Sequence, residues 1–374
     1  MIVFRYYINL LPFVSAIIIS AARGVCIFIG RFVMFYKILR NCLFCLPGEV
    51  SHKLSLAVLN LMFKNKKILN HFLSRAPVCQ VVKSGITFKN PVGLAGGFDK
   101  NGEYIDTFFA LGFGFVEVGT VTPVAQLGNK KPRLFRLTKY KALINRMGFN
   151  NKGVDYLVGQ LKKRKVPGVV GVNVGKNKLT PMNQAVNDYI QAVEKVYLYA
   201  DYITINISSP NTPGLRQLQS FESLTPLLSG VSAVRAQLEA EHDKRVPIFI
   251  KITVDLADDD VCALYGLVVS YDFNGIITSN TTLSRAGVES HKKSQCAGGL
   301  SGEPLCNSAN LQMKLLNSVR KNDNLTFIGS GGIVKAKDAI ERRHAGADLV
   351  QLYTGLVYTG PELIHDIVAL WKDE

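Results

Sequence analysis

Residues 201–216 read DYITINISSPNTPGLR, and this stretch decides the fold. Isoleucine alternates with other residues in YITINI, which is the period-2 pattern of a strand with two different faces. Pro210 ends the strand, because proline lacks the backbone N–H that a sheet needs. Two polar residues, Asn206 and Ser209, are therefore expected at the carboxyl end of a buried strand, where barrel and open-sheet enzymes carry their chemistry.

Similar short β-rich segments, separated by helical patterns, occur along most of the chain. The expected strands are residues 92–96, 115–120, 169–175, 202–208, 248–252, 275–280, 326–332 and 348–354. Eight buried strands that alternate with helices predict an α/β fold, a closed parallel (β/α)8 TIM barrel rather than an open sheet. RLFRLT at 133–138, followed by the apolar residues 142–144, predicts an inserted hairpin above one rim.

Length and charge point to one large domain with a basic appendage. The chain has 374 residues, 48% of them hydrophobic, and a net charge of +16. Residues 1–75 hold ten Lys or Arg and one acidic residue, Glu49, so this fifth of the chain carries +9. Because the basic excess lies beside the most apolar segment, we expect an anionic membrane surface as partner and no nucleic acid. A solvated basic face is the alternative.

The amino-terminal region carries two different apolar patterns. Residues 6–22 form a mostly apolar run that is borderline for a membrane span, and the odd set of seven cysteines argues against a secreted protein. A membrane anchor or interfacial segment within residues 6–30 is expected. An amphipathic helical pattern follows and predicts docking on a bilayer surface, or alternatively a helical cap on the barrel. The expected division is an apolar segment (1–33), an amphipathic helical region (34–75) and the barrel (76–374).

Polar residues end most of the expected strands. They include Asp99, Lys100, Thr120, Asn173, Asn206, Ser209, Lys251, Ser279 and Asn280. In a parallel barrel all of them project onto the carboxyl-terminal face, so they predict a functional site there, although surface exposure alone explains part of the pattern. Five amides, which donate and accept at once, suit a flat ring with alternating N–H and C=O groups, such as a pyrimidine. These amides are Asn145, Asn173, Asn206, Asn211 and Asn280.

Glycine-rich turns follow the last two expected strands. GSGG at 329–332 and YTG at 353–355 stand where barrels bind phosphate, although a tight strand-to-helix turn also explains GSGG. Lys100 and Lys251 are costly to bury without a matching negative charge. The anionic edge of a reduced flavin supplies such a charge, and a structural ion pair is the alternative. Neither a dinucleotide fingerprint nor a P-loop occurs, the six histidines lack ligand spacing, and no metal is expected.

Eight ordered motifs carry a family resemblance. They are LAGGFDKNGE (94–103), EVGTVTP (117–123), NRMGFNN (145–151), GVNVGKN (171–177), NISSPNTPGLR (206–216), SNTTLSR (279–285), GGLSGEPL (298–305) and IGSGGI (328–333). Over residues 34–374 the sequence resembles dihydroorotate dehydrogenases of the membrane-associated, quinone-dependent class (class 2). The sister class has cysteine where Ser209 stands, so the serine supports the quinone class.

The resemblance implies an FMN-dependent oxidoreductase of de novo pyrimidine (UMP) biosynthesis. It would oxidise (S)-dihydroorotate to orotate, with one FMN per chain as hydride acceptor and a membrane quinone as co-substrate. Ser209 would be the general base, and helices around residues 39–74 would form the quinone tunnel. The family also implies a monomer, peripheral on the cytoplasmic face of a bacterial inner membrane.

The resemblance also assigns binding residues. For the substrate these are Lys100, Asn145, Arg146, Met147, Gly148, Phe149, Asn206, Asn211, Asn280 and Thr281. For FMN they are Gly96, Gly97, Phe98, Asp99, Lys100, Thr120, Asn173, Asn206, Lys251, Ser279, Gly302, Gly332, Tyr353 and Thr354. Ser279 stands where the family commonly has threonine, a change that keeps the hydroxyl.

Three alternative functions remain at the level of sequence. Two are FMN barrels that act on a pyrimidine, namely the soluble dihydroorotate class and the tRNA dihydrouridine synthases, neither of which needs amphipathic helices before the barrel. The third is a membrane-tethered barrel that binds a ligand without catalysis.

Overall fold

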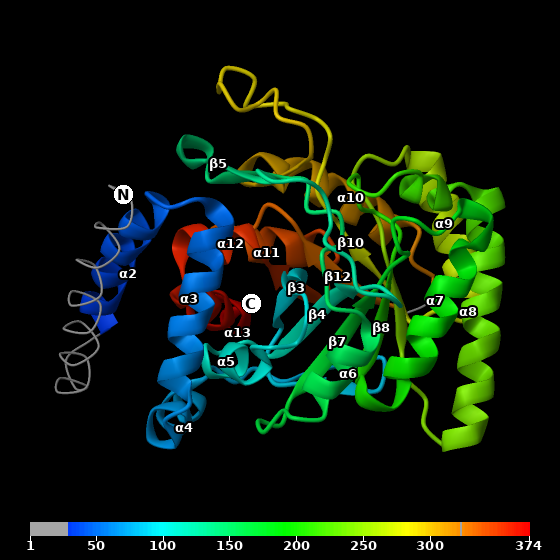
Figure 1. Ribbon diagram of the computed structural model, residues 1–374, viewed down its shortest axis with the longest axis horizontal. Helices are drawn as coiled ribbons and strands as arrows, with labels where there is room; N and C mark the ends of the chain where they lie inside the picture. The colour runs from blue at the N-terminus through cyan, green and yellow to red at the C-terminus, as the bar shows by residue number, and fades with distance from the viewer. Residues whose placement is uncertain (1–28, 322–323) are drawn as a thin grey trace. The chain divides into compact units, whose positions relative to one another are not determined.

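The structure, a computed structural model, describes residues 29–321 and 324–374 (Figure 1). The expected apolar segment at 6–22 lies outside these described residues, as does most of the expected anchor. The chain divides into two compact units, Met1–Leu46 and Pro47–Glu374. The described part of the first unit holds α2 (Ile29–Phe44), and the second unit holds the other described elements.

Eight parallel strands close into a barrel, so the predicted TIM barrel is confirmed. They are β3 (Val92–Asp99), β4 (Phe115–Val121), β7 (Val169–Val174), β8 (Tyr202–Asn206), β9 (Ile248–Lys251), β10 (Gly275–Thr278), β12 (Thr326–Ser330) and β13 (Leu349–Leu352). Their order around the barrel is β10-β12-β13-β3-β4-β7-β8-β9. Because all eight run in one direction, their carboxyl ends and the loops that follow them meet at one end of the molecule.

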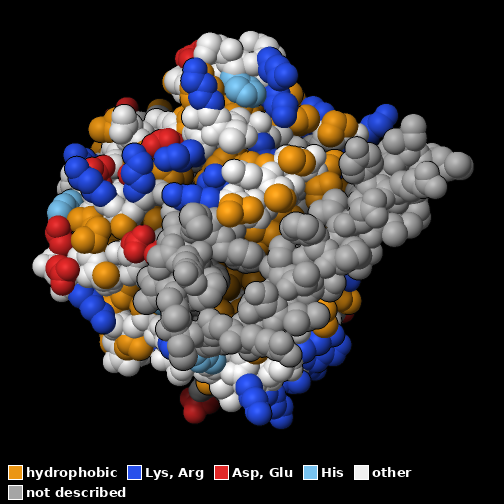
Figure 2. All heavy atoms as spheres, turned by 90° about the vertical axis from the view of Figure 1, so that its left-hand side faces the viewer, with side chains coloured by type: hydrophobic (Ala, Val, Ile, Leu, Met, Phe, Trp, Pro, Cys, Tyr) orange, Lys and Arg blue, Asp and Glu red, His pale blue; other side chains and the backbone are white. Residues whose placement is uncertain are grey.

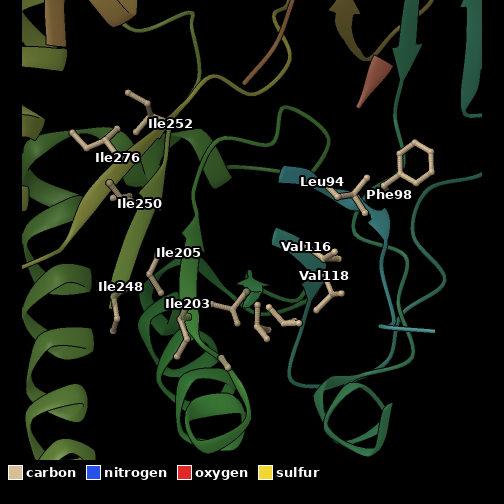
Figure 3. Close-up of a cluster of buried hydrophobic side chains, with 14 of the residues drawn as sticks. Leu94, Phe98, Val116, Val118, Ile203, Ile205, Ile248, Ile250, Ile252 and Ile276 are labelled. Carbon is tan, nitrogen blue, oxygen red and sulfur yellow. The ribbon is translucent and has the colours of Figure 1, made fainter. Parts of the chain in front are cut away.

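Helices follow or connect the strands and surround the barrel in Figure 1. They are α5 (Ile105–Ala110), α6 (Val154–Leu161), α7 (Ala185–Val196), α8 (Phe221–His242), α9 (Asp258–Ser270), α10 (Cys306–Ser318), α11 (Ala336–His344), α12 (Thr354–Thr359) and α13 (Glu362–Asp373). Outward-facing apolar side chains of the strands pack beneath these helices (Figure 3), including Leu94, Val116, Ile203 and Ile250. The period-2 alternation of strand side chains thus separates this outer core from the barrel interior.

The interior of the barrel changes character along its axis. At the amino-terminal end of the strands it is filled by large apolar side chains, among them Phe115, Tyr202 and Phe249. A two-stranded antiparallel sheet of β1 (Val81–Lys83) and β2 (Ile86–Phe88) adds Phe88, whose ring centroid lies 5.1 Å from that of Phe115. Toward the carboxyl ends the inward-facing side chains are polar, so the apolar end forms a closed floor beneath a polar chamber.

The predicted inserted hairpin is confirmed at the carboxyl end of the barrel. β5 (Leu134–Leu137) pairs with β6 (Ala142–Asn145) in antiparallel fashion, and the hairpin lies above the barrel in Figure 1. A third strand, β11 (Gly299–Gly302), joins the other edge of β6. β11 carries no signal in the sequence, because this pairing joins segments more than 150 residues apart and GLSG lacks strand-forming residues.

Two helices precede the barrel within the second unit. They are α3 (Gly48–Phe63) and α4 (Lys66–Arg75). α3 buries Leu56 and Phe63, whereas Leu54 and Leu61 remain 44% and 62% exposed. On the face shown in Figure 2, apolar side chains and Lys or Arg side chains lie among one another wherever the atoms are not grey. Within residues 29–321 and 324–374, no helix combines the length and the apolar character that crossing a membrane requires.

Candidate active site

A cavity opens at the carboxyl end of the barrel, and about 950 Å³ of space, open solvent at its mouth included, lies between its lining residues. It is lined by residues from the ends of most barrel strands, from the loops after them and from β11. Of the predicted substrate residues, the lining includes Lys100, Asn145, Met147, Gly148, Phe149, Asn206, Asn211, Asn280 and Thr281. Of the predicted FMN residues, it includes Gly96, Gly97, Lys100, Thr120, Asn206, Lys251, Ser279, Gly302, Gly332, Tyr353 and Thr354. Ser209 lies in the same lining.

Four predicted site residues are not part of this lining. Asn173 lies beneath it and accepts a hydrogen bond from the Thr120 hydroxyl at 2.5 Å. Phe98 packs edge-on against Tyr353, with ring centroids 5.0 Å apart. Asp99 accepts the backbone N–H groups of residues 103 and 104 ahead of α5, and burial raises the pKa of this carboxyl to about 6. Arg146 donates to the Pro132 carbonyl at 2.9 and 3.2 Å.

Ser209 lies in the loop that directly follows β8 and is buried. Its Oγ accepts the backbone N–H of Asn211 at 3.3 Å. Pro210 stands between the two residues, four positions after β8 ends at Asn206, and it lacks the N–H that sheet pairing would need. The loop is held from outside by Arg216, which donates to the Ser208 carbonyl at 3.1 Å and to the Thr281 carbonyl at 2.9 Å. The serine hydroxyl therefore has a defined position at the cavity wall.

Hydrogen-bonded amides form the wall around Ser209. Asn206 Nδ2 donates to Thr120 Oγ1 at 2.9 Å and to Asn173 Oδ1 at 3.0 Å. On the other side, Asn280 Nδ2 donates to the Ser208 hydroxyl at 2.8 Å. Thr281 Oγ1 is buried and, among the described residues, has no hydrogen-bond partner. A buried hydroxyl without a partner costs free energy, so this atom fits a site that a polar ligand completes.

Glu117 is the centre of the polar chamber beneath the cavity and is fully buried. Its carboxylate accepts Asn173 Nδ2 at 2.7 Å and Gln351 Nε2 at 2.8 Å, and it also accepts the hydroxyls of Tyr202 and Thr204. Lys251 Nζ lies 3.9 Å from it, a distance too long for a direct hydrogen bond. Burial lowers the pKa of Lys251, and the charge of Glu117 partly offsets this. Lys251 Nζ also donates to Gln351 Oε1 at 3.4 Å.

Lys100 is the second lysine of the site, and its Nζ donates to the Gly97 carbonyl at 2.5 Å. Burial lowers its pKa to about 8, an effect that Glu49 and Asp99 oppose and Arg133 reinforces. The ammonium group is therefore mostly charged at neutral pH but titrates within an accessible range. A cation at a cavity wall suits the carboxylate of an anionic substrate.

The glycine-rich turn after β12 is held from behind by Arg342, which is fully buried. Its guanidinium donates to the carbonyls of Ser330 at 2.9 Å and Gly331 at 3.0 Å. In a trans peptide the C=O and N–H point in opposite directions, so fixing these carbonyls aims the N–H groups of Gly331 and Gly332 away from the arginine. Both glycines line the cavity, and at Gly332 an added Cβ would lie 2.3 Å from Cys306 Cα.

Comparison with known proteins decides the family. The family model described as dihydroorotate dehydrogenase matches residues 78–372, which span the whole barrel. The chain belongs to this family. Its relatives place it in the quinone-dependent class, as the resemblance implied, and the protein is an oxidoreductase.

The relatives of this dihydroorotate dehydrogenase chain match it over nearly their full length. A protein of Coxiella burnetii named dihydroorotate dehydrogenase (quinone) is 50% identical over 335 residues, which cover 90% of this chain and 96% of the relative. One of the same name from Saccharophagus degradans is 48% identical, covering 88% and 96%. The crystal structure of the Eimeria tenella DHODH in complex with ferulenol superposes with a TM-score of 0.76 at 35% identity, covering 86% of this chain and 89% of that one.

Three side chains of the site were not predicted from the sequence, namely Glu117, Gln351 and Arg342. Glu117 and Gln351 interrupt apolar strands, in FVEVGTV and LVQL, at inward-facing positions. A polar residue in phase with the barrel interior is a readable signal, because it has to find partners inside. Arg342 lies on α11 among charged neighbours, and nothing in RRH distinguishes it from a surface residue.

Proposed function

We propose that the protein oxidises (S)-dihydroorotate to orotate in pyrimidine biosynthesis, with FMN as hydride acceptor and a membrane quinone as final electron acceptor. One observation carries this proposal. Ser209 shares a single cavity with the amides of residues 145, 206, 211 and 280, with Lys100 and with the glycine-rich turn after β12. A small cyclic diamide with a carboxylate matches the first set of groups, and a phosphate matches the turn.

The residues present fit FMN. The N–H groups of Gly331 and Gly332 would hold its phosphate, and Thr120, Asn206 and Lys251 would lie along the ring system, with Lys251 facing its anionic edge. Gly96 lets the backbone pass close over the polar chamber, since an added Cβ would lie 2.5 Å from Glu117 Oε1. When bound, FMN supplies the acceptor for the hydride from C6 of dihydroorotate.

Ser209 would remove the proton from C5 of the substrate. A serine hydroxyl is a weak base, so the proton it gains has to pass on to water or a neighbouring group. The Asn211 N–H, which donates to Ser209 Oγ, stabilises negative charge that develops on this oxygen. Lys100 would bind the substrate carboxylate and thereby orient C5 toward the serine.

α3 supports a route for the quinone. His52 on α3 lies with its Nε2 3.1 Å from the Phe98 carbonyl oxygen, and the two rings are 4.9 Å apart. Phe98 in turn contacts Tyr353, which lines the cavity. This chain of contacts joins the helix to the proposed flavin site. Burial lowers the pKa of His52 to about 3, so the imidazole is neutral and suits an uncharged quinone.

The exposed stripe of α3 supports peripheral binding to a membrane. Leu54 and Leu61 face away from the barrel, and Lys64, Lys66 and Lys67 follow at the end of the helix. Apolar groups flanked by cations bind an anionic bilayer surface. We propose a monomer at the cytoplasmic face of the inner membrane. Leu61→Glu should weaken sedimentation with anionic vesicles severalfold, whereas Leu311→Glu on α10 should not; equal binding of both variants would contradict this proposal.

The activity is tested with purified full-length protein. It should be yellow with one FMN per chain, and dihydroorotate added without oxygen should bleach the flavin absorbance. A short-chain quinone should then restore the colour. Failure to bleach would exclude the proposed reaction and favour a barrel that binds a ligand without catalysis. Recolouring by a water-soluble acceptor but not by quinone would indicate a soluble class instead.

A further inference from the structure

The first turn of α3 contacts the segment before the inserted hairpin through a partly buried ion pair. Arg133, directly before β5, is 6% exposed, and its Nε donates to Glu49 Oε1 at 2.9 Å. Lys131 lies at the edge of the same carboxylate, 4.0 Å from Oε2. Beside the pair, a Cβ added to Gly48 would lie 2.9 Å from Leu134 Cδ2. The helix and the segment before β5 are therefore in direct contact.

Arg133 also closes the loop that precedes it. Its Nη1 donates to the carbonyl of Leu127 at 2.7 Å and to that of Asn129 at 2.9 Å. Between them Gly128 has a φ of +74°, and an added Cβ would lie 2.3 Å from the Met147 carbonyl oxygen. One guanidinium thus holds a helix on one side and a tight loop on the other, with the planar geometry that arginine alone provides.

The same loop holds two segments of the proposed substrate site. The Asn129 N–H donates to the Met147 carbonyl at 3.0 Å, and Asn129 Nδ2 donates to the Asn211 carbonyl at 3.0 Å. Met147 and Asn211 both line the cavity. Asn211 is the residue whose N–H donates to Ser209 Oγ. Asn129 therefore connects the 145–149 segment with the segment that carries the proposed base.

Charges at this junction also act on Lys100. Glu49 raises its pKa and Arg133 lowers it, in both cases through their charge. The other ionisable groups near it are Asp99, which raises the pKa, and His52, which is neutral near pH 7. Glu49 and Arg133 thus shift the pKa of Lys100 in opposite directions.

We propose that Glu49 and Arg133 are positioning residues for dihydroorotate, which fix the 127–129 loop and, through Asn129, the Met147 and Asn211 segments. The inference rests on the proposed function and extends it. α3 completes the substrate site in addition to bordering the quinone route. Breaking the pair loosens the Met147 and Asn211 segments more than Ser209 itself, because Arg216 holds the loop that carries Ser209 through the Ser208 and Thr281 carbonyls.

The test uses the full-length FMN-loaded protein and the reductive half-reaction alone, in which no quinone takes part. Anaerobic stopped-flow mixing with dihydroorotate gives the substrate Kd and the limiting rate of flavin bleaching. Glu49→Gln should raise the Kd about tenfold, equivalent to about 1.4 kcal/mol. The limiting rate should stay within about twofold, because the reacting groups are unchanged. Orotate affinity, measured from the flavin spectrum, should fall in parallel.

The pH profile separates this role from a general loss of stability. Glu49→Gln should move the alkaline limb of kcat/KM to lower pH, because Lys100 loses the charge that raises its pKa. Arg133→Gln should move the same limb to higher pH. Arg133→Lys should raise the Kd without moving the limb, because it keeps the charge but loses the two-sided geometry.

Asp155→Asn is the matched control. It removes an ion pair at 2.8 Å between Asp155 on α6 and Lys195 on α7, away from the cavity lining. It should leave the Kd and the pH profile unchanged. The proposal would be overturned if Glu49→Gln and Arg133→Gln both kept the wild-type Kd and the wild-type alkaline limb of kcat/KM. It would also be overturned if the two variants moved this limb in the same direction. If the wild-type protein itself is not bleached by dihydroorotate, the proposed function fails and this inference falls with it.

Discussion

The floor of the barrel and the chamber above it are built on the same strands but have opposite chemistry. Phe115 and Glu117 both point inward from β4, and Phe249 and Lys251 both point inward from β9. Two residues along each strand, the interior changes from aromatic packing to buried charge. The floor contributes apolar burial, whereas the chamber holds charges that are costly to bury. The strands thus carry stability at one end and chemistry at the other.

The largest effect is expected at the cavity wall, where Ser209→Ala should remove the proposed base. The rate of flavin bleaching by dihydroorotate should fall about 10²- to 10⁴-fold, the usual contribution of a general base. Orotate affinity and the melting temperature should remain close to those of the wild type, because one hydroxyl is lost from a preformed site. An unchanged single-turnover rate would remove Ser209 from the mechanism.

Phe249→Ala should show the reverse pattern at the floor. Truncating this fully buried ring should lower the free energy of unfolding by about 3–5 kcal/mol. Molecules that remain folded should bind FMN and dihydroorotate normally, because the cavity lies at the other end of β9. Denaturant unfolding and substrate titration measure the two quantities separately. A large change in substrate Kd would show that floor and chamber are coupled.

Arg342→Met tests how the glycine-rich turn is held. Loss of the charged hydrogen bonds to the Ser330 and Gly331 carbonyls should cost about 1.5–3 kcal/mol, mainly as weaker FMN binding. The FMN content after dialysis and the Kd from flavin fluorescence measure this effect. Arg343→Met is the control. Arg343 is the next residue along α11, but its guanidinium lies over the Trp371 ring, 4.9 Å from the ring centroid, and not behind the glycine-rich turn. Equal FMN loss in both variants would refute the role of Arg342.

The most gradual effect is expected from pH. Lys100 has its pKa lowered to about 8 by burial, so it is cationic below this value and neutral above it. Under the proposed function the cation binds the substrate carboxylate, so kcat/KM for dihydroorotate should be constant below about pH 8 and fall about tenfold per pH unit above it. Lys100→Met should remove this limb and leave a low, pH-independent value. A wild-type profile flat to pH 10 would contradict this role for Lys100.

Much of the site was predictable because parallel strands impose a common direction. Period-2 alternation placed the eight strands, and a polar residue at each carboxyl end then had to meet the others, as Thr120, Asn206, Lys251 and Asn280 do. The amphipathic pattern before the barrel predicted either docking on a bilayer or a cap on the barrel, and α3 presents both faces: Leu56 and Phe63 are buried, whereas Leu54 and Leu61 are exposed. A helical period identifies a stripe and does not say what covers it.

The order of residues along the chain therefore determined the barrel, the face on which its chemistry lies and the family. These properties follow from local alternation, turn residues and motif spacing, all of which can be read within a few residues of one another. Only the tertiary structure decided which distant groups touch, namely Glu117 with Gln351, Arg342 with the Gly331 carbonyl, and Glu49 with Arg133. Each of these contacts joins segments with no shared local pattern, since burial and hydrogen bonding select such partners only after the barrel has closed.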